Sequence, residues 1–340
     1  WDRAKQDFEW QEDLATPFYY RRQVHSLYAM ANEQFGKFSI ESGLRADRVL
    51  DELQIETANA DRDIKRFCLF PSAHLSYDAG EVGSFRFGYS YRTNRPGIWT
   101  LEPYITYEDY YTKKIGNPDI RPEYIHSLEL GWNKAFTDGN SLSAIAYYRH
   151  RKDLSDWVRR AYEPGITLDS IVNAGNQNEM GIEVNTITKP LKWWSSTLGG
   201  SVFHYDFNSK CPVCTDRTGW HYLVNWINAF TVASATKLQF DTHFVGPKIL
   251  THGREKSYVY FDLAARQQLA KGKLTLSLVA HDVFHTARYY NTRISDGLSS
   301  VTRVRPKYLN LMFSISYNFN ASKHKVEDVS SGNLFEGKEF

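Results

Sequence analysis

Hydrophobic and polar residues alternate with a period of two along most of this 340-residue chain. In the run 85–92, aromatic residues alternate with Arg, Gly and Ser, and in the run 309–319, Leu, Phe, Ile and Tyr alternate with Asn, Met and Ser. Such alternation is typical of β-strands that have one apolar and one polar face. The sequence therefore predicts an all-β fold built from antiparallel strands.

The same pattern predicts thirteen strands, separated by segments rich in Gly, Asp, Asn and Pro. The expected strands are 18–32, 37–56, 66–78, 83–93, 123–136, 139–152, 178–188, 192–207, 218–233, 236–246, 256–269, 273–285 and 305–319. Short and long connections alternate strictly between them, and the long ones are 57–65, 94–122, 153–177, 208–217, 247–255 and 286–304. This regularity is typical of a transmembrane β-barrel, which has tight turns at one end and long loops at the other.

An odd number of strands cannot close a barrel with both chain ends on the same side. Two explanations stay open: the N-terminal segment 1–17 adds one more strand, or the chain is the C-terminal part of a larger barrel. We favour the second, because Phe8 and Trp10 lie among acidic, basic and amide residues and make a weak strand. The expected organisation is segment 1–17 as an external loop or extra strand, a barrel over 18–319, and a tail over 320–340.

Composition agrees with a barrel and excludes other classes of protein. The mean hydropathy of −0.51 and the lack of any run of about 18 apolar residues exclude transmembrane helices. A barrel strand needs only about 10 residues with every second one apolar. The net charge of +2 indicates no nucleic-acid partner. Aromatic residues make up 15% of the chain and cluster near predicted strand ends, as in the aromatic girdles that contact lipid headgroups.

The polar positions of the predicted strands include charges of both signs. Those expected to face the barrel interior are Glu41, Arg45, Arg86, Arg92, Glu129, Glu183, Asp241, His243, Asp262 and Arg266. A hydrated lumen accepts such a lining, whereas the core of a soluble β-sandwich would bury these charges at high cost. The alternative is a soluble barrel or sandwich whose charged face meets bulk water.

The connection 94–122 has the composition of a binding loop, since prolines and a Gly-Asn pair fix turns and tyrosines offer amphipathic contact area. We expect a ligand or a partner to contact residues in this loop and on the strand before it. The candidates are Arg86, Arg92, Trp99, Tyr104, Tyr107, Tyr110, Tyr111, Asn117, Asp119 and Arg121.

The run GNPDIRPE at 116–123, directly before the strand 124–131, resembles a signature of the outer-membrane β-barrel family related to TonB-dependent receptors. The segments 43–45, 173–175, 181–183, 274–284 and 316–319 are similar to this family too, and the resemblance covers about 20–319. It implies an outer-membrane location and, in full-length relatives, a 22-stranded barrel with a plug that a TonB-type energy-coupling protein pulls upon. No plug or TonB box is recognisable here, so active transport rests on analogy.

The resemblance implies uptake of a solute across the outer membrane, with long loops extracellular and with short turns and the C-terminus periplasmic. The alternative is a non-transporting structural subunit of an outer-membrane assembly, held by lipoproteins or other barrels. The expected partners are outer-membrane lipid and, under the two alternatives, either a TonB-type energy-coupling protein or lipoproteins and other barrels. We expect no cofactor and no metal. We also expect no enzymatic activity, because neither Asp241 with His243 nor His281 with Asp282 has a recognisable nucleophile beside it.

Cys211 and Cys214 form a CxxC in a predicted external loop, where a local disulfide is expected in an oxidising setting. A thioredoxin-type site would need a βαβ context, and a zinc site would need two further ligands, for which His204 and His221 are candidates. Cys68 stands apart in the sequence and is expected to pack as a small hydrophobic residue.

Overall fold

A computed structural model describes residues 18–55, 62–212, 214–295 and 297–319 of the chain. The segments 1–17 and 320–340, expected to be an N-terminal segment and a periplasmic tail, lie outside the described residues. Within the described ranges, no helix is long and apolar enough to cross a membrane.

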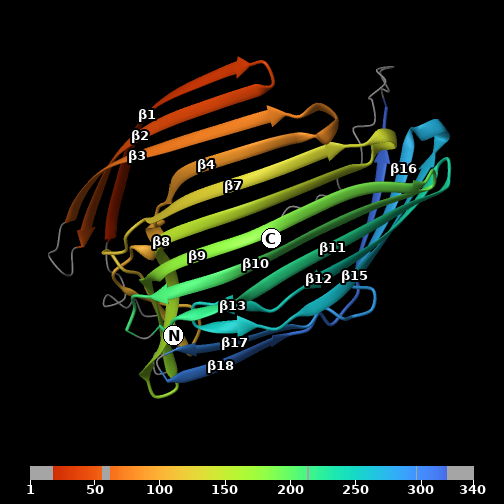
Figure 1. Cartoon of the computed structure of the whole chain (residues 1–340). Coiled ribbons are helices and arrows are strands. Elements are labelled where there is room, and N and C mark those ends of the chain that lie inside the picture. The colour runs from red at the N-terminus through yellow and green to blue at the C-terminus, as the bar shows by residue number, and fades with distance from the viewer. Residues whose placement is uncertain (1–17, 56–61, 213, 296, 320–340) are drawn as a thin grey trace.

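Thirteen antiparallel strands follow one another side by side in chain order and form a curved sheet (Figure 1). They are β1 (Phe18–Phe35), β2 (Phe38–Ile55), β3 (Arg62–Asp78), β4 (Ser84–Asn94), β7 (Glu123–Ala135), β8 (Ser141–Glu163), β9 (Ile166–Leu191), β10 (Trp194–Ser209), β11 (Arg217–Ala233), β12 (Thr236–Val245), β15 (Tyr258–Leu269), β16 (Leu274–His281) and β19 (Asn310–Tyr317). The thirteen strands expected from the alternation are therefore confirmed, with shifts at their ends.

The register places the predicted interior residues on one face of this sheet. Residues directly opposite each other in antiparallel strands point to the same side, so the face can be followed from strand to strand. Glu41 lies opposite His74, and Asp241 lies opposite Asp262. Followed in this way across every pair, all ten predicted interior residues share one face, which we call the inner face.

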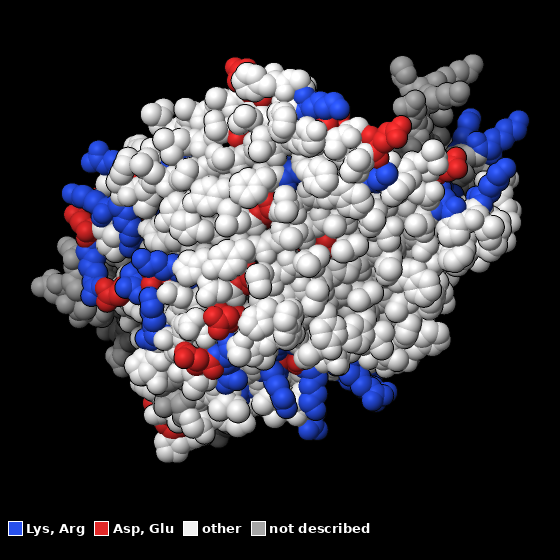
Figure 2. Space-filling view, in the orientation of Figure 1, with Lys and Arg blue, Asp and Glu red and all other residues white. Residues whose placement is uncertain are grey.

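The other face, here called the outer face, carries large apolar side chains that the protein itself leaves exposed. They include Leu44, Leu75, Phe87, Leu130, Ile182, Trp226, Leu238, Leu263, Leu278 and Phe313, which are 39–62% exposed. In Figure 2, Lys, Arg, Asp and Glu are sparse over the middle of the visible surface and gather toward its margins. A continuous apolar face of this size requires a nonpolar environment such as lipid.

The two ends of the strands differ, as expected. At one end, here called the turn end, short connections include Gly36 with φ of 59° and the 3-10 turns Gly80–Val82, Thr137–Gly139 and Ala270–Gly272. At the other end, here called the loop end, the connections are longer and carry further elements. Those elements are β5 (Ile105–Tyr107), β6 (Thr112–Ile115), β13 (Lys248–Leu250), β14 (Gly253–Glu255), β17 (Tyr289–Ser295), β18 (Leu298–Val304) and the 3-10 turn Ile98–Thr100.

The prediction of a long loop over 153–177 is wrong. Strands β8 and β9 continue through it to a turn at Pro164 and Gly165, and we call this extension the outer hairpin. The register shifts between Arg151 and Leu154, where Asp153 has a positive φ of 54°. A β-bulge of this kind changes the phase of the alternation, which ended the strand pattern in the sequence.

Strands β13, β14, β17 and β18 form a separate four-stranded sheet, which we call the loop sheet. It joins two connections that are distant in sequence, because Glu255 of β14 pairs with Asn291 of β17. The connection 95–122, which we call the tethered loop, is attached differently: its strand β6 runs parallel to β9, with Thr112 opposite Thr167.

The thirteen-stranded sheet is open in the part of the chain that the structure describes. Strand β1 pairs with β2 alone, and β19 pairs with β16 alone. Each of these two strands therefore leaves one backbone edge without a strand partner among the described residues.

Candidate functional site

The tethered loop crosses the loop end from the first strands to the outer hairpin. Its Leu101 and Ile120 are buried at 3% and 2% exposure, and they form one cluster with Leu53 of β2 and Ile171 of β9. Burial of two large aliphatic side chains stabilises the docked loop by roughly 3–6 kcal/mol. The loop is therefore a fixed part of the fold.

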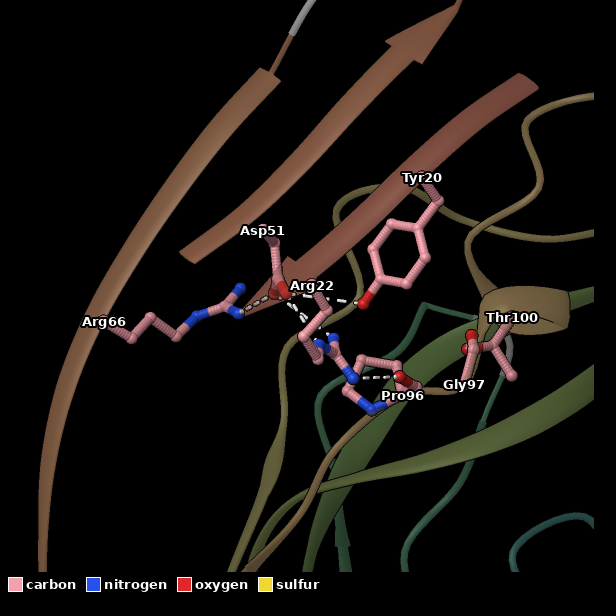
Figure 3. A network of polar contacts seen from close by, with 7 residues as sticks. All are labelled: Tyr20, Arg22, Asp51, Arg66, Pro96, Gly97 and Thr100. Carbon is pink, nitrogen blue, oxygen red and sulfur yellow. Dashed lines mark hydrogen bonds and ion pairs between the residues drawn. The ribbon is translucent and has the colours of Figure 1, made fainter. Parts of the chain in front are cut away.

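Buried carboxylates hold the start of the tethered loop against β1, β2 and β3. Asp51, 3% exposed, accepts hydrogen bonds from Arg22 Nε at 2.6 Å and from Arg66 Nη1 at 3.1 Å. The same Arg22 donates through Nη1 to the Pro96 carbonyl at 2.9 Å, so one guanidinium joins the carboxylate to the loop (Figure 3). Charge-assisted bonds of this kind are stronger than neutral ones.

A second carboxylate, four residues earlier on the same face of β2, makes a similar set of contacts. Asp47 is buried at 1% exposure and pairs with Arg95 of the tethered loop and with Arg45 Nε at 3.2 Å. Arg45, which was expected on the interior face, also lies 4.8 Å from the centre of the Phe70 ring. Both buried aspartates of β2 thus serve the attachment of the loop.

The GNPDIRPE run ends the tethered loop, and its polar groups are used inside the protein. Asn117 accepts the Asp119 N–H at 2.9 Å and donates to the Ile171 carbonyl at 3.4 Å, while Asp119 pairs with Arg62. Gly116 is required by close packing, since a Cβ there would lie 2.7 Å from both the backbone nitrogen and the oxygen of Glu102.

The end of the run is attached to the outer hairpin in the same manner. Arg121 donates its N–H to Asn173 Oδ1 at 2.9 Å and its Nη2 to Asp153 Oδ1 at 2.9 Å. Glu123, 5% exposed, accepts the Ser155 N–H at 2.8 Å and the Ser155 hydroxyl at 2.6 Å. The motif that best indicated the family is therefore a structural element that binds the tethered loop to β8 and β9.

The predicted site residues of the tethered loop consequently separate into three groups. Asn117, Asp119 and Arg121 are engaged in the contacts just described. Tyr104 packs edge-on against Phe18 at 6.3 Å between ring centres. The aromatic residues that stand free at the loop end are Trp99, Tyr107, Tyr110 and Tyr111, which are 57–84% exposed.

The two arginines of β4 do not join the loop residues in one site. Arg86 donates to Ser76 Oγ at 3.5 Å and lies in a small cleft with Glu41 and His74, toward the turn end. Arg92 lies on the same inner face six residues farther along, which corresponds to roughly 20 Å of strand. The structure brings Arg92, and not Arg86, close to the start of the tethered loop.

Charge and burial shift the pKa of groups in the tethered loop. The Glu163 carboxylate raises the pKa of Lys113, to which it is hydrogen-bonded at 3.0 Å. Burial raises the pKa of Glu102, and the nearby Lys114 acts in the opposite direction.

Two clefts at the loop end were not found from the sequence. One has a volume of about 310 Å³ and lies where β13 approaches the inner face, lined by Arg151, Glu179, Tyr205, His221, Lys248 and others. The second, of about 300 Å³, lies between the outer hairpin and the loop sheet. Each combines residues from connections far apart in sequence, so no local motif could have indicated it.

Cys211 and Cys214 are free thiols in the structure, so the expected disulfide is absent from it. The Cys214 N–H donates to the Cys211 carbonyl at 3.2 Å in a tight turn, and both side chains lie in a cluster with Leu154, Val158 and Phe207. Burial, together with the neighbouring Cys211 thiol, raises the pKa of the Cys214 thiol. Cys68 lies within 3.5 Å of the Tyr124 hydroxyl, so it has a polar contact beyond simple packing.

A comparison with protein-family models matches residues 2–317 to the outer membrane protein beta-barrel family. The chain belongs to this family. Its outer-membrane location follows, and the apolar outer face is the lipid-facing surface of the barrel. No curated protein matches the sequence.

Solved structures show the same fold at low sequence identity. The siderophore receptor PiuA from Acinetobacter baumannii is 15% identical, with a TM-score of 0.62 over 88% of this chain and 44% of that one. The ferric-catecholate import receptor Fiu from E. coli K12 is 12% identical, with a TM-score of 0.63 over 88% and 45%. The copper transporter OprC is 12% identical, with a TM-score of 0.68 over 88% and 50%. This chain thus spans about half the length of each.

Proposed function

We propose that this chain forms the C-terminal half of an outer-membrane receptor barrel that takes up a solute. The observation that carries the proposal is the sorting of faces, with charged residues on the inner face and large apolar residues on the outer face of thirteen continuous strands. A polar lumen inside a lipid-facing wall is the arrangement that a solute path requires. The similarity to halves of PiuA, Fiu and OprC supports this reading.

The open edges of the sheet support the proposal that further strands complete the barrel. Backbone groups in hydrocarbon must be hydrogen-bonded, so β1 and β19 need partner strands when the sheet stands in a membrane. We infer that further strands and a plug belong to the same polypeptide, that a TonB-type protein supplies the energy, and that the loop end faces the cell exterior.

We infer no enzymatic role for the titratable residues of the inner face. His281 Nδ1 lies 3.1 Å from Asp262 Oδ2, and His243 Nε2 lies 3.7 Å from the same oxygen. The two imidazole rings contact the Asp262 carboxylate, which lies directly opposite Asp241 in the sheet. The cluster therefore has a structural reason to exist.

Uptake by intact cells tests the proposal. Cells without the gene should fail to deplete at least one solute from a defined medium, measured by mass spectrometry of the medium. The native gene should restore depletion, and Arg86→Glu with Arg92→Glu should reduce its rate by roughly tenfold or more, because reversal changes the charge of the inner face. Lys134→Glu, a charge reversal on the outer face beside a short turn, is the control.

Depletion that is unchanged in cells without the gene would contradict uptake. The alternative of a structural subunit would then be favoured if the protein co-purifies with lipoproteins or other barrels in the absence of any solute.

A further inference from the structure

The cleft of about 300 Å³ between the outer hairpin and the loop sheet is lined by polar side chains together with Trp157, Tyr289 and Leu298. One wall is a single face of the β17–β18 hairpin. Asn291 lies opposite Thr302, Arg293 opposite Ser300, and Ser295 opposite Leu298, so the register turns these side chains to the same side.

The second wall comes from the outer hairpin. Arg159 donates from Nε and Nη2 to the two carboxylate oxygens of Asp169, each at 2.6 Å, so its charge is balanced. Trp157 stands beside this pair on β8, and Lys114 of the tethered loop lies 4.0 Å from the centre of its ring. The cleft therefore offers two aromatic side chains, Trp157 and Tyr289, among groups that donate and accept hydrogen bonds.

Two buried polar atoms of this cleft have no hydrogen-bond partner among the described residues. They are Asn291 Oδ1 and Ser295 Oγ, in residues that are 4% and 5% exposed. The amide orientation of Asn291 is fixed, because its Nδ2 donates to the Tyr289 hydroxyl at 3.2 Å, which itself donates to Glu255 at 2.6 Å. Buried polar groups are normally paired, so these two atoms indicate a ligand.

We propose that this cleft binds a hydroxyl-rich solute with the chemistry of a saccharide. Asn291 Oδ1 can only accept a hydrogen bond, so an ionised carboxylate leaves it unpaired, and phosphate, which keeps one or two O–H donors at pH 7, brings negatively charged oxygens against it. A hydroxyl group both donates and accepts, and it therefore satisfies Asn291 and Ser295 together. The Trp157 ring supplies the apolar contact that the carbon face of a sugar ring requires.

This inference rests on the proposed function, because the cleft would hold the solute that the barrel takes up. It names the chemical class of that solute. The cleft lies at the loop end, where a solute would arrive before reaching the inner face.

The test is binding to the purified, detergent-solubilised protein, measured by titration calorimetry with maltose, cellobiose and lactose, and with inorganic phosphate for comparison. At least one disaccharide should bind, and phosphate should not. Asn291→Leu, which removes the acceptor while keeping a side chain of similar shape, should weaken the binding of that disaccharide at least roughly tenfold. Ser295→Ala should weaken it less, because it removes one hydroxyl from a smaller side chain.

Ser299→Ala is the matched control, since Ser299 lies on the opposite face of the same hairpin, paired with Ile294. It should bind like the native protein. Absence of disaccharide binding, binding of phosphate alone, or equal affinity in the native protein, Asn291→Leu and Ser295→Ala would each overturn the proposal.

Failure of this inference and failure of the proposed function give different results. If the protein binds a disaccharide but cells without the gene deplete the medium as native cells do, the saccharide site is supported and uptake is contradicted. Loss of depletion of another solute, without disaccharide binding, would leave uptake standing and contradict the saccharide site.

Discussion

The tethered loop and the loop sheet cover the same end of the strands, but they use their polar groups in opposite ways. Around the tethered loop, the Asp51 and Asp153 carboxylates and the Asn173 amide accept hydrogen bonds from Arg22, Arg66 and Arg121. Asp47 Oδ1 has no hydrogen-bond partner among the described residues, but it lies 3.2 Å from Arg45 Nε in an ion pair. In the loop sheet, Asn291 Oδ1 and Ser295 Oγ stay without partners among the described residues. The comparison teaches that the recognisable motif of the chain builds the frame, while the buried unpaired polar groups of the loop sheet come from less distinctive connections.

The largest effect is expected from Asp51→Asn, which breaks the frame. It leaves the guanidinium groups of Arg22 and Arg66 without their shared carboxylate, and loss of one partner of a largely buried ion pair costs about 3–5 kcal/mol. The free energy of unfolding in lipid vesicles should fall accordingly, and proteases should cut the tethered loop faster.

The neighbouring Glu52→Gln is the control for this prediction. Glu52 pairs with Arg21 at 3.9 Å, and both side chains are about half exposed, so the loss should be about 0–1 kcal/mol. Equal stability of the Asp51 and Glu52 variants would show that the buried aspartate does not hold the loop.

A smaller effect is expected from Gly116→Ala. The added Cβ would overlap the backbone of Glu102, and relieving such crowding typically costs about 1–3 kcal/mol. Gly97→Ala, in the same loop, meets nothing within 4 Å and has an ordinary φ of −78°, so it should be neutral. Thermal unfolding compares the two, and equal midpoints would contradict the close packing of the GNPDIRPE run.

A kinetic effect without a large change in stability is expected at the cysteine pair. Because burial raises the pKa of Cys214, less thiolate is present at pH 8 than in an exposed thiol, and alkylation of the reduced protein should be slow there. The rate should keep rising above pH 9. The variant Cys68→Ser with Cys211→Ser, in which only Cys214 can react, isolates the signal, and a rate that levels off near pH 8.5 would contradict the raised pKa.

The disulfide between Cys211 and Cys214 stays a prediction. Native protein isolated without reductant should resist alkylation until it is reduced, and mass spectrometry should show the loss of two hydrogens. Free thiols in such a preparation would match the arrangement in the structure.

Alternation sufficed to predict the strands because each one faces lipid on one side and a polar interior on the other. The runs 85–92 and 309–319 show this in β4 and β19. The outer hairpin was missed because the irregular pairing around Asp153 and Leu154 interrupts the alternation. The loop sheet was missed because its strands have three to seven residues and pair across distant connections.

For a related reason, the sequence did not indicate which of the candidate site residues already have partners within the protein. Sequence composition distinguishes residues suited to contact a ligand, such as Trp99 and Tyr110, but it does not show which polar groups already have partners. Asn117, Asp119 and Arg121 were expected to contact a ligand, and the structure uses them to hold the tethered loop. Asn291 and Ser295 have no local signature, because their role depends on packing against the outer hairpin.

The most direct test of the central claim is the intact mass of the native protein extracted from outer membranes. The account places this chain as about half of a barrel whose remaining strands and plug come from the same polypeptide, because β1 and β19 each leave an edge open and the similar receptors are covered to 44–50%. It therefore predicts a mass of roughly twice 39.4 kDa. A mass of 39.4 kDa would contradict it.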